Sequence, residues 1–227
     1  MKIETFRLKT QNILSALTEY QKKMELQLKA VQEDEYNRFD KWAEQQAEPE
    51  DGFDKELIWE INGDYYRWTY DFMFPRSLRY SFMVLLFLVL ENQLTGLCDE
   101  IAKRRSLSVR LKDLKGDILE RSKTYLHKIA NVPTIDQSHW IKIEDLSKVR
   151  NCIVHALGKV ELSVDRKRLA YLASEGWGIS ISDDSSPEPG VLVLTPEYCA
   201  HAVDDMDIFF RDLFDSAGFA RVDFKMF

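Results

Sequence analysis

Cysteine is scarce in this sequence, and that scarcity excludes the folds that depend on it. Only three cysteines occur among 227 residues, Cys98, Cys152 and Cys199, and they lie far apart in apolar surroundings. An odd number at this spacing excludes a disulfide framework and lacks the pattern of a metal site. We therefore expect three reduced, buried thiols in a cytoplasmic protein.

Long apolar runs are also missing. Residues 82–90 form an apolar run of nine residues that Glu91 closes. A membrane-spanning helix needs about 20 apolar residues, so this run is under half a span. The N-terminus carries charges and has no apolar signal-peptide core. We expect no secretory signal and no membrane partner, and we interpret residues 82–90 as the centre of a buried helix.

Positive charge is not in excess either. The formal net charge of −7 argues against a surface coated for nucleic acid, so any RNA contact would be local. The densest basic run lies between residues 103 and 115 and is typical of a solvated helix end. It is also the best candidate for substrate binding through the phosphate backbone, by Arg104, Arg105 and Arg110. No glycine-rich phosphate loop or paired-carboxylate motif is present, so we predict no cofactor and no metal.

Helical periodicity covers most of the chain. It predicts a mainly α-helical bundle of about five to six helices, with a small β-hairpin, in a single domain over residues 1–227. A long first helix is predicted within residues 1–47, starting at residue 3, and its apolar stripe thins after Val31. The distal half either reaches beyond the core to meet a partner or stays solvated beside a packed proximal half. Residues 48–52 break this helix.

An aromatic-rich segment follows at residues 53–74. We expect it to be irregular apart from a short helix at 54–61, with a turn at Asn62-Gly63-Asp64. Such segments are most often lids that pack their rings on the core. The alternative is that the rings beside Arg67 stack the bases of single-stranded RNA.

The remaining elements are predicted from residue 75 onward. Core helices are expected within residues 75–160, at 76–105, at 111–130 and, after a loop at 133–138, around 145–158. A hairpin insertion at 161–195 has strands at 176–182 and 191–194, a last helix covers 196–216, and a tail follows at 217–227.

The stretch from Asp145 to Val160 contains the residues best suited to catalysis. As a helix it places Ile143, Leu146, Val149, Ile153 and Leu157 on one apolar stripe, with a C-terminal stop at Gly158. Asn151 and His155 are four residues apart and share a face, and the long side chain of Arg150 reaches the same patch. Imidazole moves protons near neutral pH, and guanidinium binds the charge that develops on a phosphate. The alternative is a structural histidine on a half-buried helix.

The six residues from Arg150 to His155 resemble the Arg-polar-x3-His signature of HEPN-domain proteins. The resemblance covers about residues 75–216, with the motif on a late core helix before a hairpin and a final helix. It implies a metal-independent endoribonuclease that works as a homodimer, with the signature helices paired around a composite site. It also implies a toxin or phage-defence context, with an antitoxin or defence-system partner. Leu157 departs from the tyrosine that nucleotidyltransferase-paired toxins place at this position.

These residues predict specific roles in RNA cleavage. His155 exchanges a proton with the 2′-hydroxyl or the leaving 5′-oxygen, Arg150 stabilises the charged phosphorane, and Asn151 orients His155 or the phosphate. Glu91 in the middle of the predicted 76–105 helix is a candidate to orient Arg150 or His155. The rival hypothesis is a catalytically silent dimeric module that scaffolds a protein or senses a nucleotide, and it would show the signature surface buried and fully hydrogen-bonded.

Overall fold

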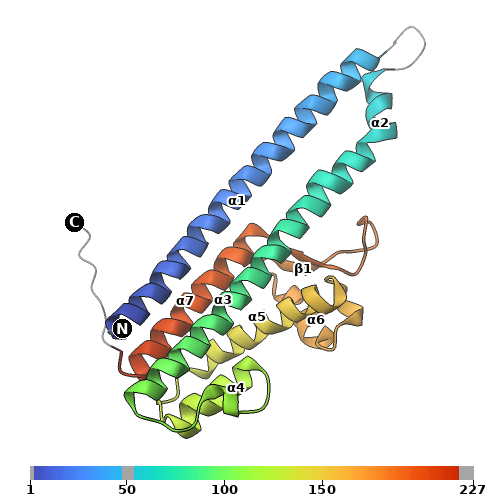
Figure 1. The fold of residues 1–227 in the computed structure, drawn as a ribbon. Helices are drawn as coiled ribbons and strands as arrows, with labels where there is room; N and C mark the ends of the chain where they lie inside the picture. Colours follow the sequence, from blue (N-terminus) through green and yellow to red (C-terminus); the bar gives the residue numbers. More distant parts are fainter. Residues whose placement is uncertain (1–2, 48–53, 220–227) are drawn as a thin grey trace, which may run out of the picture.

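Four long helices pack side by side to form the body of the protein (Figure 1). The structure is a computed structural model, and it describes residues 3–47 and 54–219. The four helices are α1 (Ile3–Gln46), α3 (Phe74–Arg104), α5 (Gln137–Ala156) and α7 (Pro196–Ser216). Helix α3 packs against each of the other three, and α1 also packs against α7. The predicted long first helix and the predicted buried 76–105 helix are both confirmed.

The bundle core is built mainly from α3, because its apolar residues recur at helical spacing. Leu86, Leu90 and Leu94 are fully buried. On the opposite side of the core, Trp140 of α5 meets Phe209 of α7 edge to face, with ring centroids 4.8 Å apart. A buried ion pair also joins α3 to α1, with the guanidinium of Arg79 held by both carboxylate oxygens of Glu25 at 2.9 Å.

The segment before α3 differs from its prediction, because it is helical throughout. Helix α2 (Lys55–Tyr66) continues through a π-helical stretch (Arg67–Met73) directly into α3. Gly63 forms no turn: it is buried in α2, where an added Cβ would lie 2.8 Å from the ring of Trp59. Pro75 lacks the N–H that a helix interior requires, and the wide π turns just before it accommodate that loss.

This continuous helix and the distal half of α1 form an arm that projects from the bundle (Figure 1). Phe39 of α1 is buried there, against the rings of Trp59 and Tyr66, at centroid distances of 4.3 and 4.1 Å. The predicted lid on the core is therefore wrong: these rings pack on α1 at a distance from the core. The predicted break at 48–52 and Phe53 lie outside the described residues.

Two helical predictions in the second half need correction. The helix predicted at 111–130 begins only at α4 (Ile118–Thr124), because Gly116, with φ of +110°, and the N-cap Asp117 separate it from a single 3-10 turn at Leu111–Asp113. A π-helical turn, Tyr125–Ile129, completes it. The polar stretch after Gly158 contains an unpredicted 3-10 turn, Val160–Leu162, and helix α6 (Arg166–Glu175).

The predicted hairpin is confirmed, with shorter strands. Strand β1 (Ile179–Ile181) pairs antiparallel with β2 (Leu192–Leu194), Ile179 opposite Leu194. A hydrogen bond connects the hairpin to α3: the Tyr80 hydroxyl donates to the Leu192 carbonyl at 2.6 Å. Helix α7 begins as predicted, with Thr195 as its N-cap. In the tail, Phe219 is buried, whereas Phe224 and Phe227 lie outside the described residues.

The helix that contains the apolar run passes a simple test for a membrane span. Within Lys55–Arg104, an 18-residue window is apolar and long enough to cross a membrane, and half of that window is buried in the fold. A core helix passes the same test. Because Phe82, Leu86 and Leu90 are buried in the bundle, the run at residues 82–90 is the centre of a buried helix, as predicted.

Candidate functional site

The signature residues Arg150, Asn151 and His155 lie on the last two turns of α5, which ends at Ala156. Leu157 then takes a left-handed conformation, with φ of +51°, and Gly158 follows with φ of +83°. Since Leu157 no longer follows the helix, its side chain leaves the apolar stripe and is 78% exposed. Its predicted place in the core is therefore wrong, whereas Val149 and Ile153 are buried as predicted.

Two neighbouring side chains hold the Arg150 guanidinium in place. Its Nη1 donates to Asn151 Oδ1 at 2.9 Å, and its central carbon lies 4.9 Å from the ring centroid of Phe87 on α3. Its Nε is buried and has no hydrogen-bond partner among the described residues. The Asn151 amide therefore contacts Arg150, a role that was not predicted, and the aromatic support from Phe87 has no signal in the motif.

His155 has an exposed side chain one helical turn beyond Asn151. Within the described part of the chain, no hydrogen bond or ion pair holds its imidazole. Cys152 lies between Asn151 and His155 in sequence but points inward and is buried, and burial raises the pKa of its thiol. The groups available at this surface are therefore an exposed imidazole without a partner in the described chain and a guanidinium held in a fixed position.

Glu91 does not orient either residue in the described chain. It is half-buried on α3, one turn beyond Phe87, but its carboxylate makes no ion pair or hydrogen bond with Arg150 or His155 in residues 3–47 and 54–219. The contact that the structure gives Glu91 is through its backbone carbonyl, which accepts from Thr95 at 2.8 Å. Its predicted orienting role is therefore not supported within one chain.

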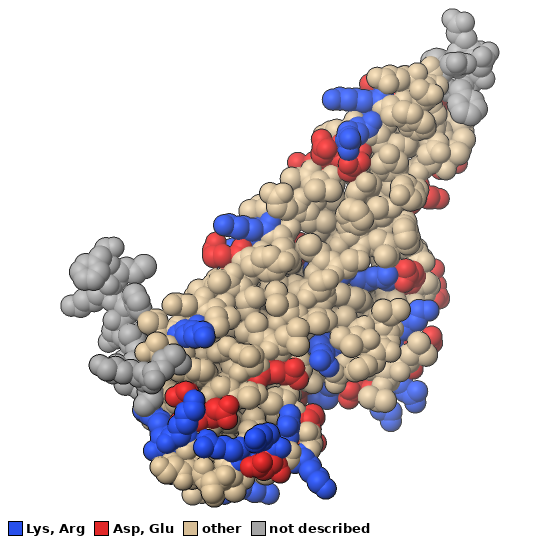
Figure 2. Space-filling model, in the orientation of Figure 1, with Lys and Arg blue, Asp and Glu red and all other residues tan. Residues whose placement is uncertain are grey.

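Several apolar side chains that lie close in sequence to Phe87 and to the signature residues are exposed. Leu88 on α3 is 51% exposed, and Leu85 of α3 and Val154 of α5 are also exposed. We call these three side chains and Leu157 the apolar rim, and together with Arg150, Asn151 and His155 the signature face. Figure 2 shows few charged side chains along the middle of α3, in contrast to the lower end of the molecule. A polar centre with an apolar rim is typical of a surface that contacts another molecule.

The predicted substrate-binding residues do not converge on the signature. Arg104 lies over the ring of Phe219 at 4.6 Å, and Arg105 donates to the carbonyl of Ala130. Only Arg110 faces a groove, of about 500 Å³, which Lys103, Lys112 and Arg121 also line. Arg121 was missed because it comes from the next helix, α4. Along α3 this basic groove is lined from Thr95 to Lys103, which lie 8 and 16 residues beyond Phe87, or about 12 to 24 Å.

No metal centre is apparent in the part of the chain that the structure describes, where no group of three or more His, Cys, Asp or Glu side chains could hold an ion. No protein-family model matches the chain, and comparison with curated proteins and with solved structures finds no match. The resemblance of residues 150–155 to the HEPN signature therefore remains a prediction.

Proposed function

We propose that this protein is a HEPN-type endoribonuclease that cleaves RNA without a metal. The observation that carries the proposal is the pairing of a fixed guanidinium, Arg150, with an unbonded imidazole, His155, on an exposed helix face. In the rival hypothesis this surface would be buried and fully hydrogen-bonded. Because His155 is exposed and has no partner in the described chain, the nuclease hypothesis is favoured.

The reaction uses the nucleophile that RNA itself carries. The 2′-oxygen attacks the adjacent phosphorus and loses its proton to one imidazole, the bond from phosphorus to the 5′-oxygen breaks, and a proton from an imidazole completes the leaving hydroxyl. The products are a 2′,3′-cyclic phosphate and a 5′-hydroxyl end. Arg150, already held by Asn151 and Phe87, stabilises the extra negative charge on the phosphorane.

A homodimer would complete this site. Each chain offers one histidine in the signature, and a two-fold axis through the signature face would bring two of them to one cleft. The apolar rim of Leu85, Leu88, Val154 and Leu157 supports this arrangement, because burying it against a second copy removes apolar surface from water. The phosphate would then meet two guanidinium groups in a protein whose net charge is −7.

The basic groove would hold the RNA strand away from the scissile bond. Its four cationic side chains, Lys103, Arg110, Lys112 and Arg121, outnumber its one carboxylate, Asp99. The distance of about 12 to 24 Å along α3 corresponds to about four to seven nucleotides of a stacked strand. We therefore expect substrates shorter than this to be cleaved less efficiently than longer ones.

The decisive experiment is a cleavage assay of His155→Ala on a mixed RNA substrate in the presence of EDTA. The wild-type protein should cut and leave 2′,3′-cyclic phosphate ends, and a DNA strand of the same sequence should resist because it lacks the nucleophile. The variant should not cut. His139→Ala, at the other end of α5, is the matched control and should retain activity. A His155→Ala variant as active as the wild type would refute the assignment.

A second candidate function is a catalytically silent dimeric module that binds a protein or a nucleotide. The observation that favours it is the projecting arm, where Trp42, Tyr65 and Trp68 are exposed. This function predicts a wild-type protein that cuts no RNA. The cytoplasmic location and the antitoxin or defence-system partner are proposals that rest on the HEPN resemblance.

A further inference from the structure

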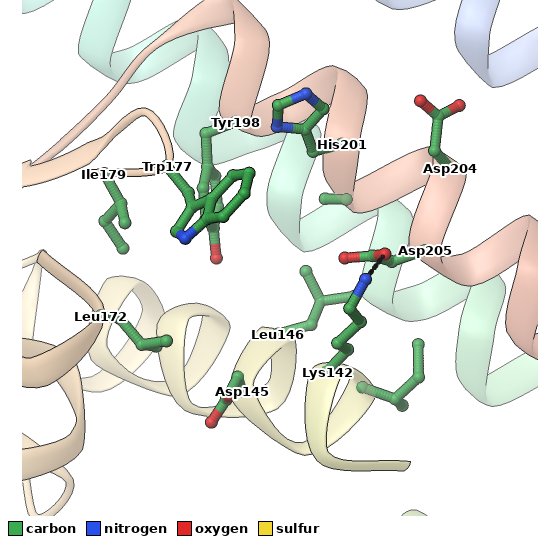
Figure 3. Close-up of a pocket in the computed structure, with 12 residues that line it drawn as sticks. Lys142, Asp145, Leu146, Leu172, Trp177, Ile179, Tyr198, His201, Asp204 and Asp205 are labelled. Carbon is green, nitrogen blue, oxygen red and sulfur yellow. Dashed lines mark hydrogen bonds and ion pairs between the residues drawn. The ribbon is translucent and has the colours of Figure 1, made fainter. Parts of the chain in front are cut away.

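A second concave site lies on the other side of α5. It is a pocket of about 430 Å³ between α5, α6, β1 and α7 (Figure 3). Leu146 lines it, and Leu146 and His155 are nine residues apart, which is two and a half helical turns, so the two side chains project from opposite sides of α5. The pocket is therefore separate from the signature face, and the proposed function leaves it unexplained.

The inner wall of this pocket is apolar. Ile143 and Leu146 of α5, Leu172 of α6 and Ile179 of β1 line it. At the mouth stands Trp177, which is 66% exposed and whose indole meets the His201 ring edge to face, with centroids 6.4 Å apart. An indole left open to water beside an apolar wall offers a flat surface for a ring or a cation.

One hydroxyl group, that of Tyr198, lines the pocket. The Tyr198 side chain extends from α7 into the space between Trp177 and Leu146, with its oxygen at the far end (Figure 3). The structure shows no hydrogen bond to that oxygen within residues 3–47 and 54–219. Burial raises the pKa of this phenol, so it stays a neutral O–H at physiological pH. Tyr198 is half-buried and lines the pocket, so a ligand with a polar group would take the place of water as the partner of this hydroxyl.

The charges that line the pocket favour a cation. Three carboxylates and one ammonium group lie along it. Asp145 is held by Arg168 at 2.8 and 2.6 Å and by Lys148 at 3.5 Å. Asp205 is paired with Lys142 at 2.6 Å. Asp204 is exposed on the rim and has no ion pair in the described part of the chain. The carboxylate left without an ion pair is therefore that of Asp204, which favours a cation over a phosphate or a carboxylate at this edge of the pocket.

We propose that this pocket binds a small cationic molecule that carries a flat apolar ring, such as an arylalkylamine. The ring would lie between the indole of Trp177 and the apolar wall, and the ammonium group would face the carboxylates of Asp204 and Asp205. A polar substituent would bond the Tyr198 hydroxyl. The volume of about 430 Å³ is within the range of about 300 to 1,000 Å³ that small-molecule sites occupy.

The test is calorimetric titration of the full chain with three probes that share one ring. These are 2-(1-naphthyl)ethylamine, 2-(1-naphthyl)ethanol and 3-(1-naphthyl)propanoate, which differ in the charge of the head group. The amine should bind tightest, the alcohol more weakly and the carboxylate weakest. Equal affinities for all three, or no binding of the amine at millimolar concentration, would overturn the proposal.

Variants locate the binding site. Trp177→Ala should weaken amine binding about tenfold, because it removes the cation–π and ring contacts. Trp42→Ala on the arm should leave amine binding unchanged.

Asp204→Asn should weaken binding of the amine about threefold and leave binding of the alcohol unaffected. Asp184→Asn in the hairpin turn is its control. Tyr198→Phe removes only the hydroxyl. Amine binding that survives both Trp177→Ala and Asp204→Asn unchanged would place the ligand elsewhere and refute the assignment.

Discussion

Arg150 occupies a fixed position before any substrate is bound, because a ring supports its guanidinium and an amide accepts one of its N–H groups. We predict that Arg150→Lys lowers the cleavage rate at least about a hundredfold, since an ammonium group keeps the charge but loses the planar fork. Single-turnover cleavage of a defined RNA would measure the loss. The melting temperature should change by only a few degrees, and near-wild-type cleavage would remove Arg150 from the mechanism.

The buried thiols make stability depend on pH in the alkaline range. Burial raises the pKa of Cys98 and of Cys199 from 9.0 to about 12. Between these values an unfolded chain loses thiol protons that the folded chain keeps, so the free energy of unfolding should fall as the pH rises from about 9 to about 12.

Urea unfolding at about pH 8 and about pH 10.5 would measure this decrease. Cys98→Ala removes one of the two thiols, so its stability should depend less steeply on pH over the same range. Rapid alkylation of Cys98 or Cys199 by iodoacetamide in the folded protein would contradict their burial.

For single residues, the sequence predicts positions along one helix better than contacts between two helices. Helical periodicity placed Arg150, Asn151 and His155 on one region of α5, and Val149 and Ile153 in the core. It could not predict Phe87 beneath Arg150, because that contact joins residues 63 positions apart in the chain. It also misplaced Leu157, because periodicity holds only as far as the last helical residue.

Among the glycines of the described chain, Gly158, two residues after the end of α5, has the least room for a side chain. Gly158 has φ of +83°, and a Cβ there would lie 2.0 Å from the Tyr80 hydroxyl oxygen, which bonds β2 at Leu192. We predict that Gly158→Ala lowers the free energy of unfolding by about 3 kcal/mol, through backbone strain and displacement of Tyr80.

Gly190→Ala is the control for this prediction. Gly190 has φ of +76° and nothing within 4 Å of an added Cβ. Gly190→Ala should therefore lower the free energy of unfolding through backbone strain alone, by about 1 kcal/mol. Urea unfolding of both variants would measure the difference. Equal losses would show that Tyr80 adjusts without loss of packing.

The differences between predicted and observed elements have local causes. Gly63 and Pro75 usually break helices, yet one continuous helix runs from Lys55 to Arg104. The ring of Trp59 fills the space beside Gly63, and π turns precede Pro75. Helix α6 was missed because its residues are mostly polar and exposed, with Leu169 its only buried residue, so it has too few apolar positions to show a period.

For the whole molecule, the signature face predicts the assembly. Light scattering at micromolar concentration should report about twice the chain mass of 26.6 kDa. Leu88→Glu should produce monomers and lose cleavage together, because it places a charge in the apolar rim next to the signature. Leu26→Glu, at a leucine of α1 that is also exposed, is the matched control. A wild-type monomer, or an active Leu88→Glu dimer, would refute the composite site.

The projecting arm also determines how the molecule moves through solvent. The 44 residues of α1 span about 66 Å. This length is nearly four times the radius of gyration of about 17 Å that a compact chain of 227 residues would have. Frictional drag therefore exceeds that of a sphere of the same mass. In gel filtration a single chain would elute early, at an apparent mass well above 26.6 kDa, and could pass for a dimer.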